Sequence, residues 1–257
     1  MKLTEEQMAS YREKGWVVVP GVLSKDELGV VEGAIRKIAG DRQEGHTEVF
    51  YGLHLKDERF KSLVRHPALV EPTRQLLEND IYVMNSRVNL KHTGGTVMKW
   101  HQDFGTFHRL DGVPEPRGVM SAVFLDEVNA CNAPLLAIPG SHREGLVEAI
   151  QTDPDGPAST GGKYRFDIPA ETLDRLVKKY GLEAITGPAG SMLYMDMTVV
   201  HGSSINITPL RRIIVYINYN AIDNRGNTFA RPEDYSARDF NAVQAQERDC
   251  LLRHMAA

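Results

Sequence analysis

The sequence predicts a mainly β domain, a sandwich or a barrel, with helices gathered ahead of it in the chain. From Ile81 onward, short runs rich in Val, Ile, Tyr and Phe recur between Gly, Pro and Asn, which is typical of all-β domains rather than of βαβ units. Before residue 80, two capping boxes precede segments with helical spacing. The 257 residues are 42% hydrophobic and 25% charged, a composition typical of a globular protein.

The first 80 residues are expected to form helices and one strand. A Thr-x-x-Gln capping box begins a helix that ends at Gly15, and a short buried strand, WVVV, follows it. A Ser-x-x-Glu capping box begins a second helix, which runs to Gly40. Residues 41–48 are predicted to be a polar loop. A further helix is predicted over 67–78, with Asn79 as its stop.

Six strands are predicted in the second part of the chain: 81–90, 97–104, 118–125, 134–138, 191–200 and 211–219. One helix interrupts them, from near Pro169 to Gly181. The stretch DPDGPASTGGK, 153–163, is the strongest loop signal and a candidate lid over a pocket. Because there is no internal repeat and no long linker, residues 1–257 are expected to form a single domain, with helices of about 4–80 covering a β core of about 81–220.

Charge and cysteine content exclude several classes of protein. Lys and Arg total 30 and Asp and Glu total 34, so the net charge of −4 gives no electrostatic reason to bind nucleic acid or anionic lipid. Cys131 and Cys250 cannot make a disulfide framework or a CxxC metal knuckle. No apolar run approaches the roughly 18 residues of a membrane span, and the acidic start differs from a secretory signal. We therefore expect a cytoplasmic protein with no nucleic-acid or membrane partner.

A His-x-Asp pair, His101 and Asp103, falls within the predicted strand 97–104. Because residues i and i+2 of a strand point to the same face, the imidazole and the carboxylate are expected to project together. A further histidine, His201, follows the apolar run MTVV. Two histidines and one carboxylate on one face of a metal ion form the facial triad of non-haem Fe(II) oxygenases. These three residues are the candidate metal ligands and catalytic residues.

The His-x-Asp spacing also arises by chance. The segment His46-Thr47-Glu48 repeats it inside the predicted polar loop, where no strand is expected to hold the side chains, and we interpret it as solvated surface. The remaining histidines are interpreted as structural or exposed: His54, His66, His92, His108, His142 and His254.

Two adjacent arginines, Arg211 and Arg212, begin the strand RRIIVYINYN. A guanidinium at this place can hold a carboxylate through two parallel hydrogen bonds. Arg212 shares a half-polar strand face with Tyr216 and Asn218, whereas Arg211 shares a face with apolar residues only. A polar face in an otherwise apolar strand suits a binding lumen. Alternation therefore favours Arg212 as the carboxylate anchor.

Four segments, in order, resemble the phytanoyl-CoA dioxygenase superfamily: WHQDF, PRGVMSAVFLDEVNACNAPLLAIPGSHREG, HGSSINITPLRR and RPEDYSARDF. Within it they are most similar to the branch of ectoine hydroxylase and the free amino-acid hydroxylases. The resemblance extends from about Thr4 to Val243. It implies a double-stranded β-helix (jelly-roll, cupin-like) core and an enzyme that uses Fe(II), 2-oxoglutarate and O2.

The resemblance also implies roles for individual residues around the metal. It places the iron on the His101, Asp103 and His201 triad. It places the distal carboxylate of 2-oxoglutarate on Arg212. Further residues match family positions near the co-substrate: Ser203, Asn89 and, more weakly, Lys91.

The expected substrate is a small polar molecule, a free amino acid or an amino-acid-derived solute, hydroxylated at an unactivated C–H bond. Asn85 stands where ectoine hydroxylases carry a substrate-contacting glutamine, and Phe107 where they carry a stacking tryptophan, which argues against ectoine itself. Tyr51 lies in a second candidate lid. Arg231 and Arg238 can offer a counter-charge to a substrate carboxylate, although an ordinary surface or ion-pair role is the competing interpretation.

Other functions fit the residues less well. A specialised metabolite or a small phosphonate as substrate is an alternative within the same chemistry, because one fold hosts many reactions. A halogenase of this superfamily would carry a small residue in place of Asp103. A zinc hydrolase can use two histidines and an aspartate but has no need for Arg212. A non-catalytic β-barrel binding protein would tolerate loss of the triad, which is present.

Overall fold

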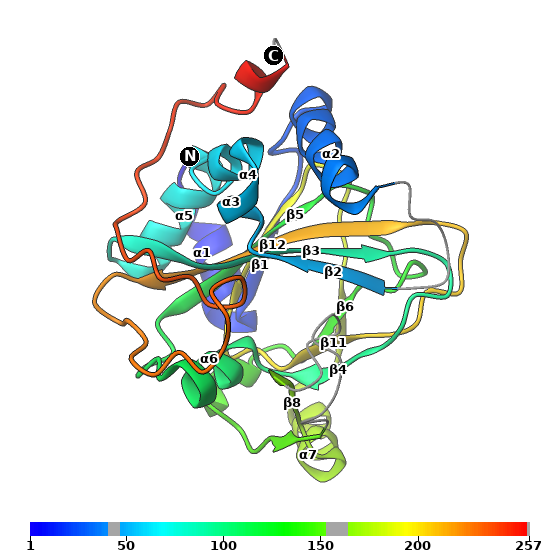
Figure 1. The fold of residues 1–257 in the computed structure, drawn as a ribbon. Helices are drawn as coiled ribbons and strands as arrows, with labels where there is room; N and C mark the ends of the chain where they lie inside the picture. Colours follow the sequence, from blue (N-terminus) through cyan, green and yellow to red (C-terminus); the bar gives the residue numbers. More distant parts are fainter. Residues whose placement is uncertain (41–46, 153–163, 256–257) are drawn as a thin grey trace.

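The β-rich runs of the sequence pair into two antiparallel sheets that face each other (Figure 1). A computed structural model describes residues 1–40, 47–152 and 164–255. The larger sheet has six strands, in the order β1 (Trp16–Val19), β10 (Met192–Asp196), β5 (Gly118–Phe124), β12 (Arg212–Ala221), β3 (Ile81–Lys91) and β2 (Thr47–Tyr51).

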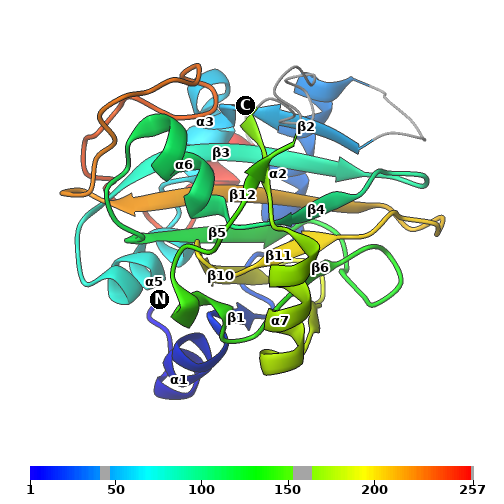
Figure 2. The same ribbon diagram turned by 90° about the horizontal axis from the view of Figure 1, so that it is seen from below.

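The smaller sheet lies opposite, as the view from below shows (Figure 2). Its order is β4 (Met98–His101), β11 (His201–Ser203), β6 (Leu135–Ala137) and β9 (Glu183–Ile185). A short pair, β7 (Ile150–Gln151) with β8 (Phe166–Asp167), adjoins it. The two facing sheets form a double-stranded β-helix, or jelly roll, which confirms the predicted fold class.

Side-chain alternation on β12 separates two cores. Ile213, Val215 and Ile217 are buried in the core between the larger sheet and the helices. Ile214 and Tyr216 are buried in the core between the two sheets. Because full burial of one such side chain contributes about 1.5–3 kcal/mol, a one-residue slip of the strand would cost several of these contributions at once. This register holds the polar residues of β12 on the inside.

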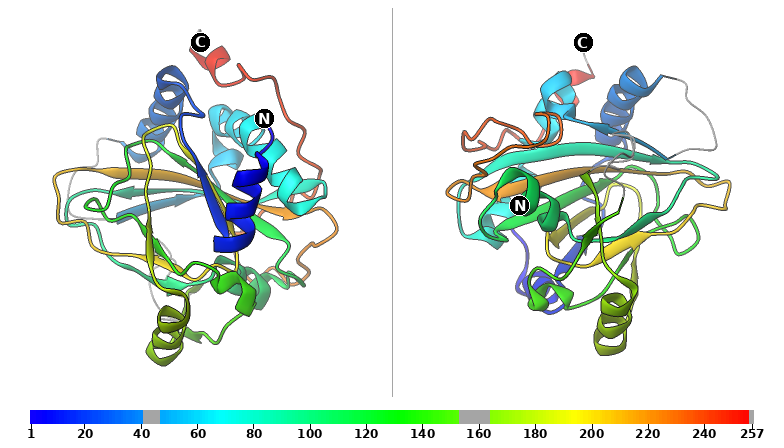
Figure 3. Two further views of the ribbon diagram at one scale, coloured as in Figure 1. Left: turned by 180° about the vertical axis from the view of Figure 1, so that it is seen from behind. Right: turned by 60° about the horizontal axis from the view of Figure 1, so that its bottom comes forward.

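The helices before β3 cover the outer face of the larger sheet (Figures 1 and 3). They are α1 (Glu5–Lys14), α2 (Lys25–Ala39), α3 (Leu53–Lys56), α4 (Glu58–Leu63) and α5 (Pro67–Leu77). Both predicted capping boxes are formed, at Thr4 and at Ser24. Gly15 ends α1 at a φ of 90°, and a Cβ there would lie 2.5 Å from Val199, so glycine is required both by conformation and by space.

Several predicted boundaries in this region are wrong. The predicted loop 41–48 is partly strand, because Thr47 and Glu48 pair with β3 as the start of β2. The helix predicted to stop at Asn79 ends at Leu77, with Glu78 as its C-cap. The short helices α3 and α4 have too few turns to show a periodic pattern, so the sequence does not predict them.

The predicted strand 97–104 is wrong in its second half. Strand β4 ends at His101, and helix α6 (Asp103–Asp111) begins two residues later. Phe104 and Phe107, which favour a strand when considered alone, lie one helical turn apart and are both buried between the sheets. Packing against the two sheets, rather than local strand propensity, therefore determines that these residues form a helix. The chain consequently has a second helix within the β region, in addition to the predicted one, α7 (Ala170–Tyr180).

After β12 the chain runs along the edge of β3 that β2 leaves unpaired, as an irregular segment, residues 222–251 (orange to red in Figure 1). Its backbone is tied to β3 where Ala237 N donates to Met84 O and Val243 N donates to Ile81 O, each bond within 2.9 Å. A short 3-10 turn, Leu252–His254, follows it. None of the helices in the described residues has the length and apolar character needed to cross a membrane.

Candidate active site

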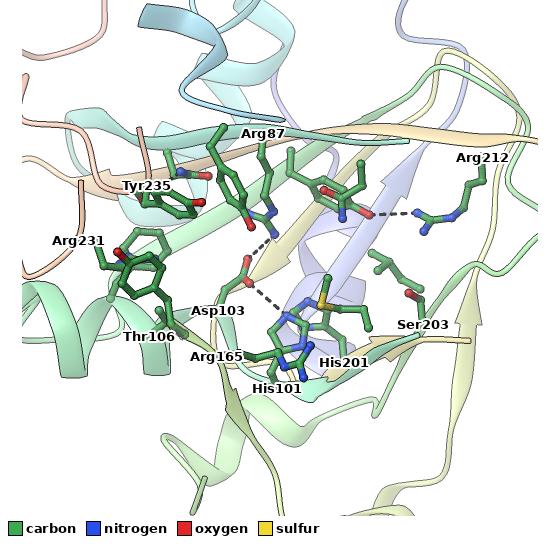
Figure 4. A pocket seen from close by; sticks show the side chains of 18 residues that line it. Arg87, His101, Asp103, Thr106, Arg165, His201, Ser203, Arg212, Arg231 and Tyr235 are labelled. Carbon is green, nitrogen blue, oxygen red and sulfur yellow. Dashed lines mark hydrogen bonds and ion pairs between the residues drawn. The ribbon is translucent and has the colours of Figure 1, made fainter. Parts of the chain in front are cut away.

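A pocket lies between the two sheets, lined by inward-facing residues of β3, β4, β11 and β12, by α6 and by the C-terminal segment (Figure 4). His101, Asp103 and His201 lie in its middle. Arg212 and Ser203 lie at one end, and Arg231 and Tyr235 at the other (Figure 4). The pocket therefore has two ends on either side of a central cluster.

The central cluster brings three potential metal-ligand atoms together. One ligand atom from each of His101, Asp103 and His201 lies within 4.8 Å of the other two. The His101 Nε2 to Asp103 Oδ1 distance is 3.5 Å, and the centroids of the two imidazole rings are 4.3 Å apart. Asp103 and His201 are buried, whereas His101 is partly exposed.

The route by which these residues meet differs from the predicted one. His101 pairs with His201 across the β4–β11 ladder. Asp103 is not in the strand: it is the first residue of α6, and Gln102 is the N-cap. A hydrogen bond of 2.9 Å from Phe104 N to Met197 O fastens this strand-to-helix junction to the turn before His201. The carboxylate thus reaches the cluster because the chain bends, not because i and i+2 share a strand face.

Both imidazoles are held by their Nδ1 atoms. The Nδ1 of His101 is 2.7 Å from Lys99 O, and the Nδ1 of His201 is 3.0 Å from Val199 O. A backbone acceptor at Nδ1 leaves Nε2 as the lone-pair nitrogen, which is how metal-bound histidines are commonly oriented. Burial and the neighbouring imidazole of His101 lower the pKa of His201 to about 4, which keeps its ring neutral.

The second oxygen of Asp103 has protein partners. Arg87 Nη2 lies 3.2 Å from Asp103 Oδ2, and Asn218 Nδ2 lies 3.4 Å from the same oxygen. Burial alone would raise the pKa of Asp103, but the charge of Arg87 and the contacts with His101 and His201 together outweigh it, and the pKa lies well below its usual range. The carboxylate is therefore ionised, with Oδ1 free to face the two imidazoles.

Sequence reasoning missed Arg87 and Asn218. Arg87 is detectable from strand alternation, because Asn85, Arg87, Asn89 and Lys91 occupy every second position of one strand. The other three of these polar positions are among the predicted site residues. The resemblance to the family assigns no role to Arg87. Asn218 is detectable in the same way, from the inward face that it shares with Arg212.

One end of the pocket is strongly cationic. Arg212 is 1% exposed, and among the described residues its guanidinium makes one hydrogen bond, from Nη1 to Tyr216 Oη at 3.2 Å. Its Nε is buried without a partner, and no ion pair joins the guanidinium to a carboxylate of the described residues. A buried unpaired charge of this kind is costly unless a ligand neutralises it. The arrangement fits a carboxylate ligand at this end.

Three further predicted residues surround Arg212. Lys91 Nζ donates to Ser203 Oγ at 2.7 Å and to Ser204 O at 2.8 Å. Burial and the charge of Arg212 lower the pKa of Lys91 to about 7. Asn89 and Ser203 line the pocket, and Asn89 Oδ1 is buried without a hydrogen bond. Lys91 does not line the pocket but acts behind Ser203.

The neighbouring Arg211 has a different environment. It precedes β12, and its side chain, 43% exposed, pairs with Glu32 and with Asp126, each at 2.9 Å. The two arginines therefore lie on opposite sides of the sheet. The apolar strand face that follows Arg211 packs against the helices, as alternation predicts.

At the opposite end, the C-terminal segment forms one wall. Asn85 Nδ2 donates to Asp234 O at 3.1 Å and to Tyr235 O at 3.0 Å. The ring centroids of Tyr235 and Tyr51 are 4.2 Å apart, and both residues line the pocket. Because Asn85 donates to two carbonyl groups, its amide orientation is set, and its Oδ1 is left as a buried acceptor without a partner.

Arg231 also reaches this end. Its Nε donates to Asp111 Oδ2 at 3.0 Å, its Nη2 also binds that oxygen, and both side chains are buried. The guanidinium lies 4.4 Å from the centroid of the Phe107 ring. A face of Phe107, the residue that stands in place of the stacking tryptophan, is thus covered by a protein cation.

One sequence-based interpretation finds no support at the pocket, and two others fall wholly or partly outside the described residues. Arg238 does not line it: its guanidinium packs on Phe229 and donates to Arg231 O at 2.7 Å. The candidate lid 153–163 lies outside the described residues. His46 of the chance His-x-Glu motif also lies outside them, and Glu48 is in β2.

The pocket of this jelly roll combines two histidines, one carboxylate and a buried arginine with an unpartnered Nε. This combination is typical of non-haem Fe(II) oxygenases that take a carboxylate co-substrate. The donor set fits iron, because imidazole and carboxylate ligands with open positions suit Fe(II).

Comparison with known proteins identifies the family. The model of the phytanoyl-CoA dioxygenase (PhyH) family matches residues 11–214. The chain is 33% identical to L-proline trans-4-hydroxylase of Streptomyces griseoviridis, covering 94% of this chain and 95% of that protein. It is 31% identical to ectoine dioxygenase of Bordetella bronchiseptica, and the match covers 94% of this chain and 85% of that protein.

Solved structures agree. EctD from S. alaskensis with 2-oxoglutarate and 5-hydroxyectoine superposes with a TM-score of 0.79 at 27% identity, covering 95% of this chain and 87% of that chain. The same protein has been solved with bound Fe. The carbocyclase SnoK, at 19% identity and a TM-score of 0.69, shows the shared fold. The chain belongs to the phytanoyl-CoA dioxygenase family and is a 2-oxoglutarate-dependent non-haem iron dioxygenase.

Proposed function

We propose that His101, Asp103 and His201 hold the iron, and that the enzyme hydroxylates a free amino acid. The support for the ligand set is the convergence of three ligand atoms and the backbone acceptors at both Nδ1 atoms. Bound Fe(II) with 2-oxoglutarate supplies O2 activation, with succinate and CO2 as products.

The co-substrate belongs at the Arg212 end. The distal carboxylate of 2-oxoglutarate would accept two hydrogen bonds from the buried guanidinium and satisfy the unpaired Nε. Ser203, positioned by Lys91, offers a further hydroxyl donor at this end. These groups neutralise and orient the co-substrate, and the hydrophobic core around them excludes water.

The substrate belongs at the Asn85 and Arg231 end. The single observation that carries this proposal is the buried, unpartnered Oδ1 of Asn85, because such an acceptor calls for an N–H donor. The ammonium group of an amino acid provides that donor, and the tyrosine pair beside it provides aromatic surface. Arg231 uses Nε and Nη2 on Asp111, which leaves Nη1 for the substrate carboxylate.

The relatives narrow the choice of substrate. The match with L-proline trans-4-hydroxylase covers 95% of the length of that protein. Contacts for ectoine are reduced here, because the two donors of Asn85 are occupied and the Phe107 face carries Arg231. L-proline is therefore the first substrate to test, ahead of ectoine.

A screen of succinate release, paired with mass spectrometry for the addition of one oxygen, tests the proposal. The panel contains L-proline, other amino acids, betaines, ectoine and small phosphonates. We expect turnover of an amino acid, with ectoine converted weakly or not at all. Asn85→Leu should raise the KM for that amino acid far more than the KM for the co-substrate. Turnover restricted to a phosphonate or a bulky apolar metabolite would refute the substrate class, and efficient ectoine conversion would refute the narrower preference.

The cytoplasmic location stays a prediction. Both cysteines are free thiols, and Cys131 is exposed, which is in keeping with a reducing compartment.

A further inference from the structure

The side chain between two of the candidate ligands, Gln102, is buried but faces away from the pocket. Its exposed fraction is 5%, and it is not among the residues that line the pocket. A buried amide must form hydrogen bonds to offset the loss of water. Its partners therefore show what this side chain does.

Three of the four hydrogen-bonding positions of the Gln102 amide are used by backbone groups. Nε2 donates to Thr198 O at 2.6 Å and to Gly145 O at 2.8 Å. Oε1 accepts from Val147 N at 3.0 Å. Both N–H groups and one acceptor lone pair are thus engaged, in a geometry that no other side chain of equal length provides.

These bonds connect the segments that carry the candidate ligands. Thr198 lies in the turn between β10 and β11, three residues before His201. Gln102 itself lies between His101 and Asp103. One side chain therefore fastens the junction of β4 with α6 to the segment that delivers the third ligand, and through Gly145 to the chain that follows the 3-10 turn Ser141–Glu144.

The sheet alone does not set this arrangement. The β4–β11 ladder pairs His101 with His201 but has a bulge between His201 and Ser203. Beyond His101 the chain leaves the sheet, so Asp103 has no ladder partner among the described strands. A second direct tie is the bond from Phe104 N to Met197 O. The Gln102 amide is thus a principal constraint between Asp103 and His201.

We infer that Gln102 is a positioning residue, whose amide sets the separation of Asp103 from His201 and so prepares the three ligands for the metal. The inference rests on the proposed ligand set. Outer partners of metal ligands typically change metal affinity by about 10- to 100-fold when they are replaced. Gln102→Met keeps the length of the side chain and removes all three hydrogen bonds.

A matched control exists on the outer face of the larger sheet. Gln75 of α5 also uses its amide on backbone: Oε1 accepts from Leu3 N at 2.7 Å, and Nε2 donates to Leu3 O at 3.2 Å. Gln75→Met removes these two hydrogen bonds, which join the start of the chain to α5, far from the pocket. This variant measures how the loss of amide hydrogen bonds to the backbone changes stability without a change near the candidate ligands.

The experiment titrates the metal-free proteins with Co(II), followed by visible absorption, and compares their thermal unfolding. We expect Gln102→Met to raise the Kd for Co(II) by about 10- to 100-fold and to alter the absorption band. Gln75→Met should lower the Tm but leave the Kd for Co(II) at the wild-type value. Gln102→Asn retains the amide with a shorter reach, and its Kd should lie between those of wild type and Gln102→Met.

The outcomes separate the inference from the proposed function. If the Gln102→Met protein has a lower Tm but the wild-type Kd for Co(II) and the wild-type spectrum, the inference is overturned, and Gln102 contributes to stability only. If Gln102→Met does not fold, an unchanged Kd in Gln102→Asn overturns it equally. A His201→Ala protein that binds Co(II) as wild type does would overturn the ligand set itself.

Discussion

Replacement of Arg212 by methionine should selectively weaken 2-oxoglutarate binding. Arg212 is 1% exposed; within the described part of the chain, Tyr216 is the one hydrogen-bond partner of its guanidinium, and Nε has none. Two charge-assisted hydrogen bonds to a buried carboxylate contribute about 1.5–3 kcal/mol each, so their loss costs about 3–6 kcal/mol. At about 1.4 kcal/mol per decade, the dissociation constant for the co-substrate should rise by about 10²- to 10⁴-fold.

Calorimetric titration of 2-oxoglutarate into the Co(II)-loaded protein measures this effect without turnover. Arg211→Met is the matched control, since its side chain is 43% exposed and its pairs with Glu32 and Asp126 lie at the surface. Such pairs contribute about 0.2–1 kcal/mol each, so we expect a Tm lower by a few degrees and an unchanged affinity. Equal affinity in the Arg212→Met protein, or loss of affinity in the Arg211→Met protein, would refute the reasoning from strand alternation.

Three further outcomes are expected. His201→Ala or Asp103→Ala should abolish both turnover and Co(II) binding, and activity near wild type in either would remove the ligand assignment. Burial and the charge of Arg212 lower the pKa of Lys91 to about 7. A bound carboxylate favours the ammonium form of Lys91 and so raises this pKa. Above pH 7, binding of the co-substrate should therefore be accompanied by uptake of a proton, and the affinity should fall as the pH rises through that value. Calorimetry in buffers of different ionisation enthalpy detects this uptake, and a pH dependence unchanged in Lys91→Met would contradict it. Asp111→Asn leaves the buried Arg231 without its carboxylate and should lower the free energy of unfolding by about 3–5 kcal/mol in urea; a loss below about 1 kcal/mol would show that the pair is not desolvated.

Local features were predictable because a few adjacent residues encode them. Both capping boxes and the glycine stop of α1 depend on side chains within one helical turn of each other, and all three form. The two faces of β12 follow from alternation alone, so the separation of Arg212 from Arg211 could be argued without a structure. The residue types of the triad indicated iron chemistry for the same reason, since ligand chemistry belongs to the side chains.

The sequence by itself thus determined the fold class, the chemistry of the ligands and the face on which the co-substrate anchor lies. Only the tertiary structure decided how these parts meet. The bend that turns Asp103 out of β4 depends on burial of Phe104 and Phe107 between the sheets. The contact of Asn85 with Tyr235 joins residues 150 positions apart. Such contacts are set by packing and sheet register across the whole chain, which no short window of sequence contains.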